Sequence, residues 1–258
     1  MGNLTKHAIV FGIANKRSIA WGVTRKLHAS GTKLTLAYQG ERFERALTKL
    51  LASEGIGDAL LVPCDVTEEG ATEAVFDRHM EHWGQLQQVV HSVAFARREE
   101  LEGDFTETSR EGYKLAHEIS AYSLIPMARA AKAHMGEEGG SMVAMSYLAA
   151  QRVVPNYNVM GSAKAALEHA VRQLAFELGP LGIRVNAVSA GPLQTVSARG
   201  VSGFADIYSA YAEKTPLKRN ITQEEVANAS AFLLGDEASG ITGQVLYVDS
   251  GFSIMASL

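Results

Sequence analysis

Residues 7–23 of the chain, HAIVFGIANKRSIAWGV, join a short apolar run, a glycine and the start of a helix. The run from His7 to Phe11 has the length and composition of a buried strand, and Gly12 stops it. Ser18 is a suitable N-cap for the helix that follows. A strand, a glycine turn and a helix open the dinucleotide-binding folds, in which the helix N-terminus faces a pyrophosphate. The spacing is not Gly-x-Gly-x-x-Gly, because Ser18 occupies a glycine position, so a plain strand-to-helix turn explains the segment equally well.

The rest of the chain repeats this alternation of strand and helix. Further strands are expected at residues 33–38, 59–64, 88–94, 141–146, 183–189 and 244–248. Helices are expected at residues 68–83, 121–135, 159–178 and 223–234, with a charged, irregular segment at residues 97–120. Pro126 is a candidate for a kink in the second of these helices. The fold class is therefore α/β: a single domain over residues 1–258, with a doubly wound, Rossmann-type parallel sheet of about seven strands and helices on both faces.

Composition limits the classes of function. With 47% apolar and 20% charged residues and a net charge of −4, the chain has no electrostatic pattern that indicates nucleic acid or an anionic membrane as a partner. Cys64 is the single cysteine, which excludes an internal disulfide, and the N-terminus carries no secretory signal, so we expect a reducing cytoplasm. His79 and His82 are interpreted as part of a solvated helix face, and no metal site is expected.

Residues 147–164, YLAAQRVVPNYNVMGSAK, contain the expected catalytic pair. Tyr157 and Lys164 are seven residues apart, so they project from one face, two turns apart, if the helix already includes Tyr157. A phenol and an ammonium group on one face can share a ligand, and the cation is expected to lower the pKa of the phenol. Such a pair can donate a proton or stabilise an oxyanion. The alternative is a buried tyrosine beside a solvated lysine.

The residues after the second and third strands are candidates for contacts with the adenosine half of a dinucleotide. Gln39 stands where such folds recognise the ribose, and a neutral amide can bond ribose hydroxyls, whereas a 2′-phosphate favours an arginine. Arg42 and Arg45 are interpreted as solvated helix charges, so NADH is favoured over NADPH. Asp65 suits either an adenine edge or the N-cap region of the next helix.

Several motifs point to one family. They are Gly12-x5-Ser18-x-Ala20-x-Gly22, Cys64-Asp65-Val66, Ser146-Tyr147-Leu148, Pro155-Asn156-Tyr157-Asn158-Val159-Met160-Gly161 with Lys164, Ser189-Ala190-Gly191-Pro192 and Val248-Asp249-Ser250-Gly251-Phe252. On these motifs, which run nearly end to end, the chain resembles the enoyl-[acyl-carrier-protein] reductases of bacterial fatty-acid synthesis, within the short-chain dehydrogenase/reductase superfamily. The superfamily's carbonyl reductases carry Tyr-x-x-x-Lys instead, and their tyrosine would fall at Met160.

The resemblance implies an activity: reduction of the trans-2 double bond of enoyl thioesters on acyl carrier protein, with hydride from NADH, by a homotetramer. Two alternatives are a carbonyl reductase of the 3-ketoacyl type and a non-catalytic dinucleotide sensor, which would not need Tyr157 and Lys164 together. In the implied mechanism Tyr157 stabilises the enolate oxygen and Lys164 holds the nicotinamide ribose. Tyr147 lines the site, and either Tyr147 or solvent supplies the proton at C2.

The resemblance also implies the residues that contact each ligand. The implied cofactor contacts are Gly12, Ser18, Ile19, Gln39, Asp65, Val66, Val93, Lys164, Leu193 and Thr195. The implied substrate contacts are Ala96, Tyr147, Tyr157, Met160 and Phe204. Residues 195–214 mix small and apolar side chains, as expected for a substrate lid that orders over an acyl chain; an ordinary surface helix and loop is the alternative. Because this segment has few basic residues, Lys218 and Arg219 are the alternative docking site for an acidic carrier protein.

Overall fold

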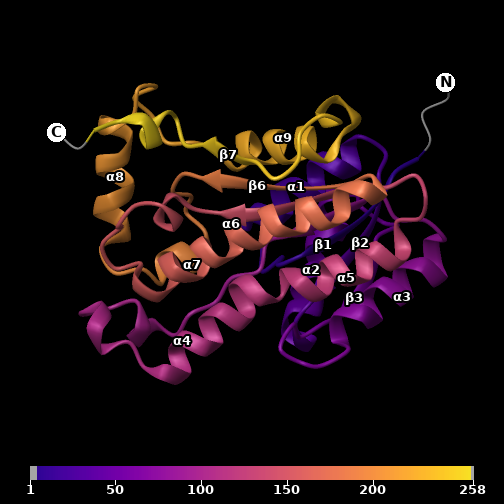
Figure 1. Cartoon of the computed structure of the whole chain (residues 1–258), viewed down its shortest axis with the longest axis horizontal. Helices are drawn as coiled ribbons and strands as arrows, with labels where there is room; N and C mark the ends of the chain where they lie inside the picture. The colour runs from indigo at the N-terminus through magenta and orange to yellow at the C-terminus, as the bar shows by residue number, and fades with distance from the viewer. Residues whose placement is uncertain (1–4, 257–258) are drawn as a thin grey trace.

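The computed structural model describes residues 5–256, leaving aside the side chains of Ser197 and Arg199. Within these residues, one sheet of seven parallel strands has the order β3-β2-β1-β4-β5-β6-β7 (Figure 1). The strands are β1 (His7–Phe11), β2 (Lys33–Tyr38), β3 (Leu60–Pro63), β4 (Gln88–His91), β5 (Gly140–Ser146), β6 (Ile183–Ala190) and β7 (Val245–Val248). The predicted α/β class with a doubly wound parallel sheet is confirmed.

Helices cover both faces of the sheet (Figure 1). They are α1 (Ile19–Ala29), α2 (Gly40–Glu54), α3 (Ala71–Trp83), α4 (Arg110–His117), α5 (Leu124–His134), α6 (Asn158–Leu178), α7 (Val196–Arg199), α8 (Phe204–Lys214) and α9 (Gln223–Leu234). Side chains of α3, α5 and α6 form the core on one face, and side chains of α1, α2 and α9 form the core on the other. None of the helices in residues 5–256 combines the length and apolar character needed to cross a membrane.

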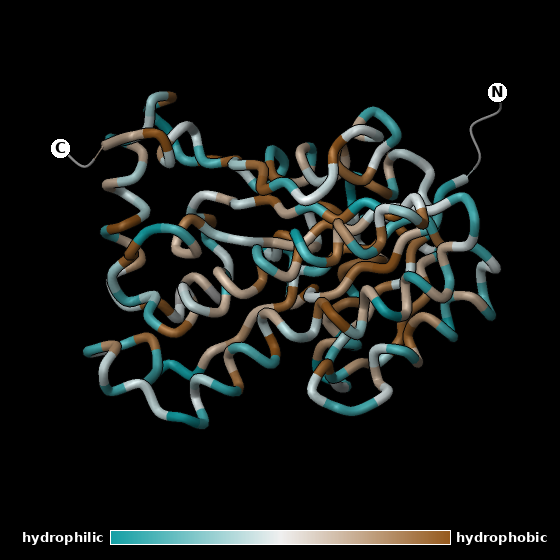
Figure 2. Tube along the Cα trace, viewed as in Figure 1, coloured by the Kyte–Doolittle hydropathy of each residue, from teal (hydrophilic) through white to brown (hydrophobic). Residues whose placement is uncertain are grey.

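The apolar run that opens the chain explains how both cores form. All five residues of β1 are buried. Because side chains alternate across a strand, Ile9 and Phe11 enter the core under α3 and α5, whereas Ala8 and Val10 pack under α1. A parallel strand covered on both faces therefore has a continuous apolar sequence rather than an alternating one. Figure 2 shows the same pattern, with the brown, hydrophobic segments gathered in the interior.

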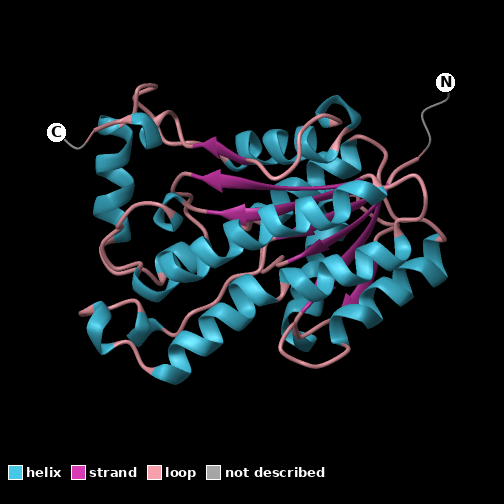
Figure 3. Cartoon of the chain, in the orientation of Figure 1, coloured by secondary structure: helices cyan, strands magenta, loops and turns pink. Residues whose placement is uncertain are grey.

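The strand order reverses at β1 and β4, because β1 pairs in parallel with β2 on one side and with β4 on the other. In such sheets a crevice opens at the carboxyl ends of the strands beside this switch point. Figure 3 shows β5, β6 and β7 pointing toward the end of the molecule where α4, α7 and α8 lie. The fold therefore places the candidate site at this end.

The segment expected to be irregular, residues 97–120, contains helix α4. Ser109 is its N-cap, and the Ser109 hydroxyl accepts a hydrogen bond of 3.0 Å from the Gly112 amide. Gly112 does not break the helix; instead its missing Cβ makes room for the Glu100 carboxylate. The prediction of an irregular segment was wrong over α4, because the N-cap signal of Ser109 was not weighed.

Three further boundaries differ from the predicted ones. A π-helical turn at Glu118–Tyr122 precedes α5, so that Pro126 falls in the first turn of α5, where a missing N–H costs nothing and no kink follows. Helix α3 begins at Ala71 with Gly70 as N-cap, which excludes the interpretation of Asp65 as a helix cap. Strand β4 ends at His91, so residues 92–96 form the loop that leaves the sheet.

Candidate active site

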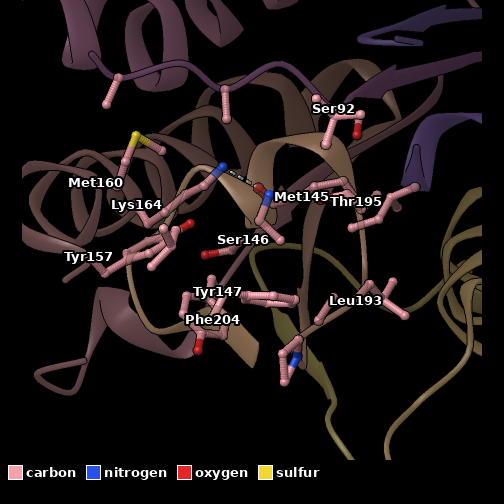
Figure 4. A pocket seen from close by; sticks show the side chains of 18 of the residues that line it. Ser92, Met145, Ser146, Tyr147, Tyr157, Met160, Lys164, Leu193, Thr195 and Phe204 are labelled. Carbon is pink, nitrogen blue, oxygen red and sulfur yellow. Dashed lines mark hydrogen bonds between the residues drawn. The ribbon is translucent and has the colours of Figure 1, made fainter. Parts of the chain in front are cut away.

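A cavity of about 280 Å³ lies at the carboxyl end of the sheet. Its walls come from the turn after β1, the segments after β4, β5 and β6, the start of α6, and the segment that carries α7 and α8. Figure 4 shows the side chains of Tyr147, Tyr157, Lys164 and Phe204 around this cavity. The long, mostly apolar cavity suits an extended ligand with few polar groups.

Tyr157 occupies the N-cap position of α6, and its ring centroid lies 4.9 Å from that of Tyr147 at an interplanar angle of 62°. Both residues are half-buried because their rings border the cavity, but their hydroxyls are withdrawn from bulk water. This desolvation raises the pKa of Tyr147 to about 12 and raises the pKa of Tyr157 above its ordinary value. The expected lowering of the Tyr157 pKa by Lys164 is therefore wrong, because burial outweighs the field of the cation.

Lys164 lies two turns into α6 and is only 4% exposed, so the alternative of a solvated lysine is wrong. Its Nζ donates a hydrogen bond of 2.7 Å to the backbone carbonyl of Met145, at the end of β5 (Figure 4). Burial lowers the pKa of Lys164 to about 8, against the opposing field of Glu168. Lys164 and Tyr157 both line the cavity, as their spacing predicts.

The turn after β1 is shaped by close backbone contact. Gly12 has φ +97°, and a Cβ at this position would overlap the backbone carbonyl of Ser92, so the turn can pass β4 only with glycine. Ser18 is the N-cap residue of α1, but its hydroxyl accepts hydrogen bonds of 3.0 Å from the amides of Ala14 and Asn15. Ser18 thus ties the loop to the helix start, which explains why a serine replaces glycine. Gly12, Ser18 and Ile19 line the cavity.

Four of the predicted cofactor residues lie outside the described walls of this cavity; they are Gln39, Asp65, Val66 and Val93. The structure does bring two of them together: Gln39 Nε2 donates a hydrogen bond of 2.6 Å to Asp65 Oδ2. The other carboxylate oxygen of Asp65 accepts from the amide and hydroxyl of Thr67. Leu193 and Thr195, also predicted as cofactor residues, line the cavity.

All five predicted substrate residues line the cavity: Ala96, Tyr147, Tyr157, Met160 and Phe204. Met160 packs in a separate apolar cluster with Leu101 and Val201, and Phe204 packs against this cluster. Ser120, in the π-helical turn, donates to Met160 Sδ at 3.7 Å and also bonds the Phe95 backbone, which fixes the loop after β4. The cluster forms an apolar continuation of the site under α8.

Sequence reasoning missed Leu101 and Glu168 and gave Ser146 no role in the site, whereas Val201 lies in the predicted lid, residues 195–214. Ser146 lines the cavity, and its hydroxyl donates a hydrogen bond of 2.7 Å to the buried carboxylate of Glu168. The signal for Glu168 was present, because an acidic residue four positions after Lys164 lies on the same helix face. Leu101 had no signal, because it lies in the segment whose structure was not predicted.

A doubly wound parallel sheet, a glycine turn under a helix N-terminus and a buried tyrosine–lysine pair at the strand ends define a dinucleotide-dependent oxidoreductase of the short-chain dehydrogenase/reductase class. Comparison with known proteins is consistent with this class and narrows it. Residues 12–253 match the family model described as Enoyl-(Acyl carrier protein) reductase. The chain therefore belongs to the enoyl-[acyl-carrier-protein] reductase family, and the resemblance drawn from the motifs is confirmed.

Individual relatives are similar over nearly the whole chain. Enoyl-[acyl-carrier-protein] reductase [NADH] FabI of Bacillus subtilis (strain 168) is 47% identical over 251 residues, which cover 97% of each protein. The [NADPH] enzyme of Staphylococcus aureus (strain MRSA252) is 49% identical over 247 residues, covering 96% of each. The crystal structure of the Bacillus cereus reductase with NADP+ and indole naphthyridinone has a TM-score of 0.95 at 48% identity, covering 98% of each chain.

Proposed function

We propose that the chain reduces the trans-2 double bond of enoyl thioesters carried by acyl carrier protein, with NADH as the hydride donor, in the final reductive step of the fatty-acid elongation cycle. Membership of the reductase family supports the reaction, and the relative from B. subtilis is named for NADH. The single observation that carries the proposal is the cavity in which Tyr147, Tyr157 and Lys164 meet at the strand ends. Met160, where carbonyl reductases of the superfamily have tyrosine, counts against carbonyl reduction.

The chain's residues fit a reduced nicotinamide dinucleotide. Gly12, Ser18 and Ile19 line the cavity beside the N-terminus of α1, where the missing Cβ of Gly12 lets the turn pack against the backbone of Ser92. Leu193 and Thr195 line the cavity as well. A bound NADH would supply the hydride to C3 of the substrate. Gln39 and Asp65 would meet the adenosine half, at the ends of β2 and β3.

Lys164 would hold the nicotinamide ribose. An ammonium group has three N–H donors, and Lys164 spends one on the Met145 carbonyl, which leaves two for the neighbouring ribose hydroxyls. The hydrogen bond to Met145 also fixes the orientation of the Lys164 side chain, so the position of its two remaining N–H donors is defined. Burial of the group strengthens these hydrogen bonds because little water competes for them.

Tyr157 would donate a hydrogen bond to the thioester oxygen. Its raised pKa keeps it a neutral phenol, so it acts as a donor rather than as a phenolate. As hydride reaches C3, negative charge develops on the thioester oxygen, and a donor preorganised out of water stabilises that enolate. Protonation at C2 completes the reduction, and Tyr147, also a neutral phenol, competes with solvent as the donor of this proton.

Leu101 and Met160 would hold the acyl chain under a lid formed by residues 195–214, which contributes Val201 to the same apolar cluster. Helix α8 is anchored at its far end, where Tyr211 stacks on Phe252 with ring centroids 4.1 Å apart. The opposite end meets α7 at Gly203, whose φ of +73° allows the turn. This end of α8 is tethered by a hydrogen bond of 2.9 Å from Asn156 Nδ2 to the Ser202 carbonyl, and a segment of this kind that begins at a glycine turn is suited to close over a bound chain.

The pairing of Gln39 with Asp65 supports NADH over NADPH. The amide of Gln39 donates to the Asp65 carboxylate, so a negative charge lies beside Gln39 at the end of β2. A 2′-phosphate at this position would meet acceptors and like charge instead of an arginine. The Staphylococcus relative, named for NADPH, shows that the family includes both preferences.

The assembly is proposed to be a homotetramer in the cytoplasm that takes its substrate from acyl carrier protein. Large apolar side chains are exposed on neighbouring elements around α5 and α6: Tyr122, Ile125 and Phe176, of which Phe176 is 78% exposed. A second copy that covers them would remove this surface from water. Arg219 forms an ion pair with Glu225 at 2.6 Å, and this pairing counts against Arg219 as a docking residue for the acidic carrier protein. Light scattering of the purified chain tests the assembly.

Steady-state kinetics test the reaction. Enoyl thioesters of graded length should be reduced with loss of reduced-nicotinamide absorbance, faster with NADH than with NADPH. A 3-ketoacyl thioester is the matched control, since it differs in the bond that is reduced. Turnover of the ketoacyl thioester in place of the enoyl thioester would reassign the enzyme to carbonyl reduction, and absence of turnover with both would favour a dinucleotide sensor.

A further inference from the structure

A carboxylate that the mechanism above does not use is buried behind the catalytic pair. Glu168, on α6, is 3% exposed and lies one helical turn after Lys164. It accepts hydrogen bonds from the Ser146 hydroxyl at 2.7 Å and from Gln151 Nε2 at 3.3 Å. A buried carboxylate is costly unless its charge is balanced and its oxygens are hydrogen-bonded, so its presence calls for a reason.

Lys164 and Glu168 hold consecutive residues at the end of β5. Lys164 bonds the carbonyl of Met145, and Glu168 bonds the hydroxyl of Ser146. The next residue is Tyr147, whose ring lies 4.9 Å from the ring of Tyr157. The two helical side chains therefore fix the strand end from which Tyr147 enters the cavity. A shift of this strand end would move Tyr147 relative to Tyr157.

Among the described residues, Glu168 is the carboxylate that balances the positive charge of Lys164. The other titratable groups around Lys164 are neutral. His91, on β4, is kept neutral by burial, which lowers its pKa to about 3. Tyr147 and Tyr157 also stay neutral, since burial raises the pKa of each. Two further groups interact around Glu168: Tyr247 of β7, whose pKa is raised mainly by burial and also by Glu168, and Arg152, whose charge opposes this rise.

We propose that Glu168 is a positioning residue that keeps the buried Lys164 side chain in its ammonium form and anchors Ser146 at the end of β5. This role of Glu168 rests on the proposed function in one respect: it requires that Lys164 binds NADH as an ammonium ion. Burial lowers the pKa of Lys164 to about 8 even with Glu168 beside it, so without this carboxylate the side chain would lose its proton at a lower pH. The field of Glu168 opposes this loss, so the carboxylate extends the pH range over which Lys164 can donate to ribose hydroxyls.

The NADH dissociation constant, measured by fluorescence between pH 6 and 9, tests the electrostatic part. In wild type, affinity should fall as pH rises through the pKa of Lys164, about 8. In Glu168→Gln, which preserves the shape but not the charge, we expect this midpoint to move down by about one pH unit. The variant should then bind NADH about fivefold more weakly than wild type at pH 8, and within about twofold of it at pH 6.

Matched variants separate charge from hydrogen bonding. Glu177→Gln removes an exposed carboxylate from the same helix and should leave the midpoint unchanged. Glu168→Asp retains the charge and should restore the midpoint. Ser146→Ala retains the charge of Glu168 but releases the strand end, so it should lower kcat without moving the midpoint. An equal midpoint in wild type and Glu168→Gln would overturn the proposal, as would a midpoint shift in Ser146→Ala that matches the one in Glu168→Gln.

Loss of folding in Glu168→Gln is also informative. In that case the double variant Lys164→Met/Glu168→Gln should fold, because it removes the unbalanced cation together with its counter-ion. A double variant that stays unfolded would contradict the charge coupling. The binding measurement is independent of turnover: a wild type that binds NADH with this pH dependence but does not reduce enoyl thioesters would refute the proposed function and leave the role of Glu168 intact.

Discussion

Burial decides the protonation state of each side chain that faces the cavity. The phenols of Tyr147 and Tyr157 remain protonated because their anions would be poorly solvated, and Lys164 approaches neutrality for the same reason. The site is therefore built from neutral donors and one cation whose charge depends on its surroundings. Catalysis by such a site consists of stabilising, with neutral donors, the negative charge that appears on the substrate, and it does not use tyrosinate as a base.

Removing the Tyr157 hydroxyl tests this interpretation. In Tyr157→Phe we expect kcat to fall about 100-fold or more, the usual loss when one preorganised donor to an oxyanion is deleted. The NADH dissociation constant should change less than about twofold, because the lost interaction is formed mainly in the transition state. Stopped-flow and steady-state measurements with a crotonyl thioester separate the two quantities.

Tyr147→Phe is the control for this variant, since the Tyr147 ring lies against that of Tyr157 and burial raises the pKa of its hydroxyl as well. A larger loss of kcat in Tyr147→Phe than in Tyr157→Phe would move the oxyanion role to Tyr147. A solvent isotope effect that disappears only in Tyr147→Phe would identify Tyr147 as the proton donor at C2.

The spacing of Tyr157 and Lys164 was sufficient to predict that both residues face one cavity, because helix geometry is a local property. Their pKa values were not predictable, because desolvation depends on Met145, Tyr147 and other residues that come from distant parts of the chain. The contribution of Glu168 was missed for a related reason: its importance depends on the burial of Lys164, which the sequence does not reveal.

At the scale of elements, the predicted bounds of helices and strands agree best with the structure where the ends of an element carry capping residues. Helix α9 has the predicted bounds, and its N-terminus is a capping box formed by Thr222 and Glu225. The segment before α5 was not predicted, because its π-helical turn at Glu118–Tyr122 has no local sequence signature. That turn directs Ser120 toward Phe95 and Ser123 toward His91, so its conformation depends on tertiary contacts.

The contribution of the proposed lid can be measured through chain length. Phe204, at the start of α8, packs against the cluster formed by Leu101, Met160 and Val201. In Phe204→Ala we expect KM for a long-chain enoyl thioester to rise about tenfold, because a partly buried aromatic side chain contributes on the order of 1.5 kcal/mol of apolar contact. KM for a crotonyl thioester, whose chain is too short to reach the cluster, should change less than about twofold.

Ser209→Ala, an exposed position on the same helix, is the matched control for Phe204→Ala and should leave both KM values unchanged. Equal losses for long and short substrates in Phe204→Ala would show that this side chain stabilises the fold of α8 rather than contacting the acyl chain.

At the scale of the whole molecule, the alternation of strands and helices was enough to predict a doubly wound parallel sheet, because few architectures accommodate that order. The interior also contains polar groups that no pattern predicted. His79, expected on a solvated face, is fully buried; its ring bonds the Thr35 hydroxyl at 2.7 Å and the Gln85 carbonyl at 2.8 Å. His91 is buried likewise, with its Nε2 2.8 Å from the Ser123 hydroxyl.

These two histidines should make the folded state sensitive to acid. Burial lowers the pKa of His79 to about 4 and that of His91 to about 3, against an ordinary value of 6.5. Below pH 6.5 the unfolded chain takes up protons at these histidines that the folded chain does not, so their contribution to the free energy of unfolding should be constant above this pH and fall between pH 6.5 and 4. Each histidine contributes a loss of up to about 2 kcal/mol by pH 5.

Urea denaturation at pH 7.5, 6 and 5 measures this loss before most carboxylates titrate. His79→Gln preserves a donor toward the Gln85 carbonyl and cannot gain a proton, so it should be less stable than wild type at pH 7.5 but lose less stability by pH 5. His82→Gln, at an exposed position on the same helix, should follow the wild-type slope. A wild-type slope in His79→Gln would mean that this ring does not couple proton uptake to unfolding, and acid sensitivity would then have to arise from His91 or from the carboxylates.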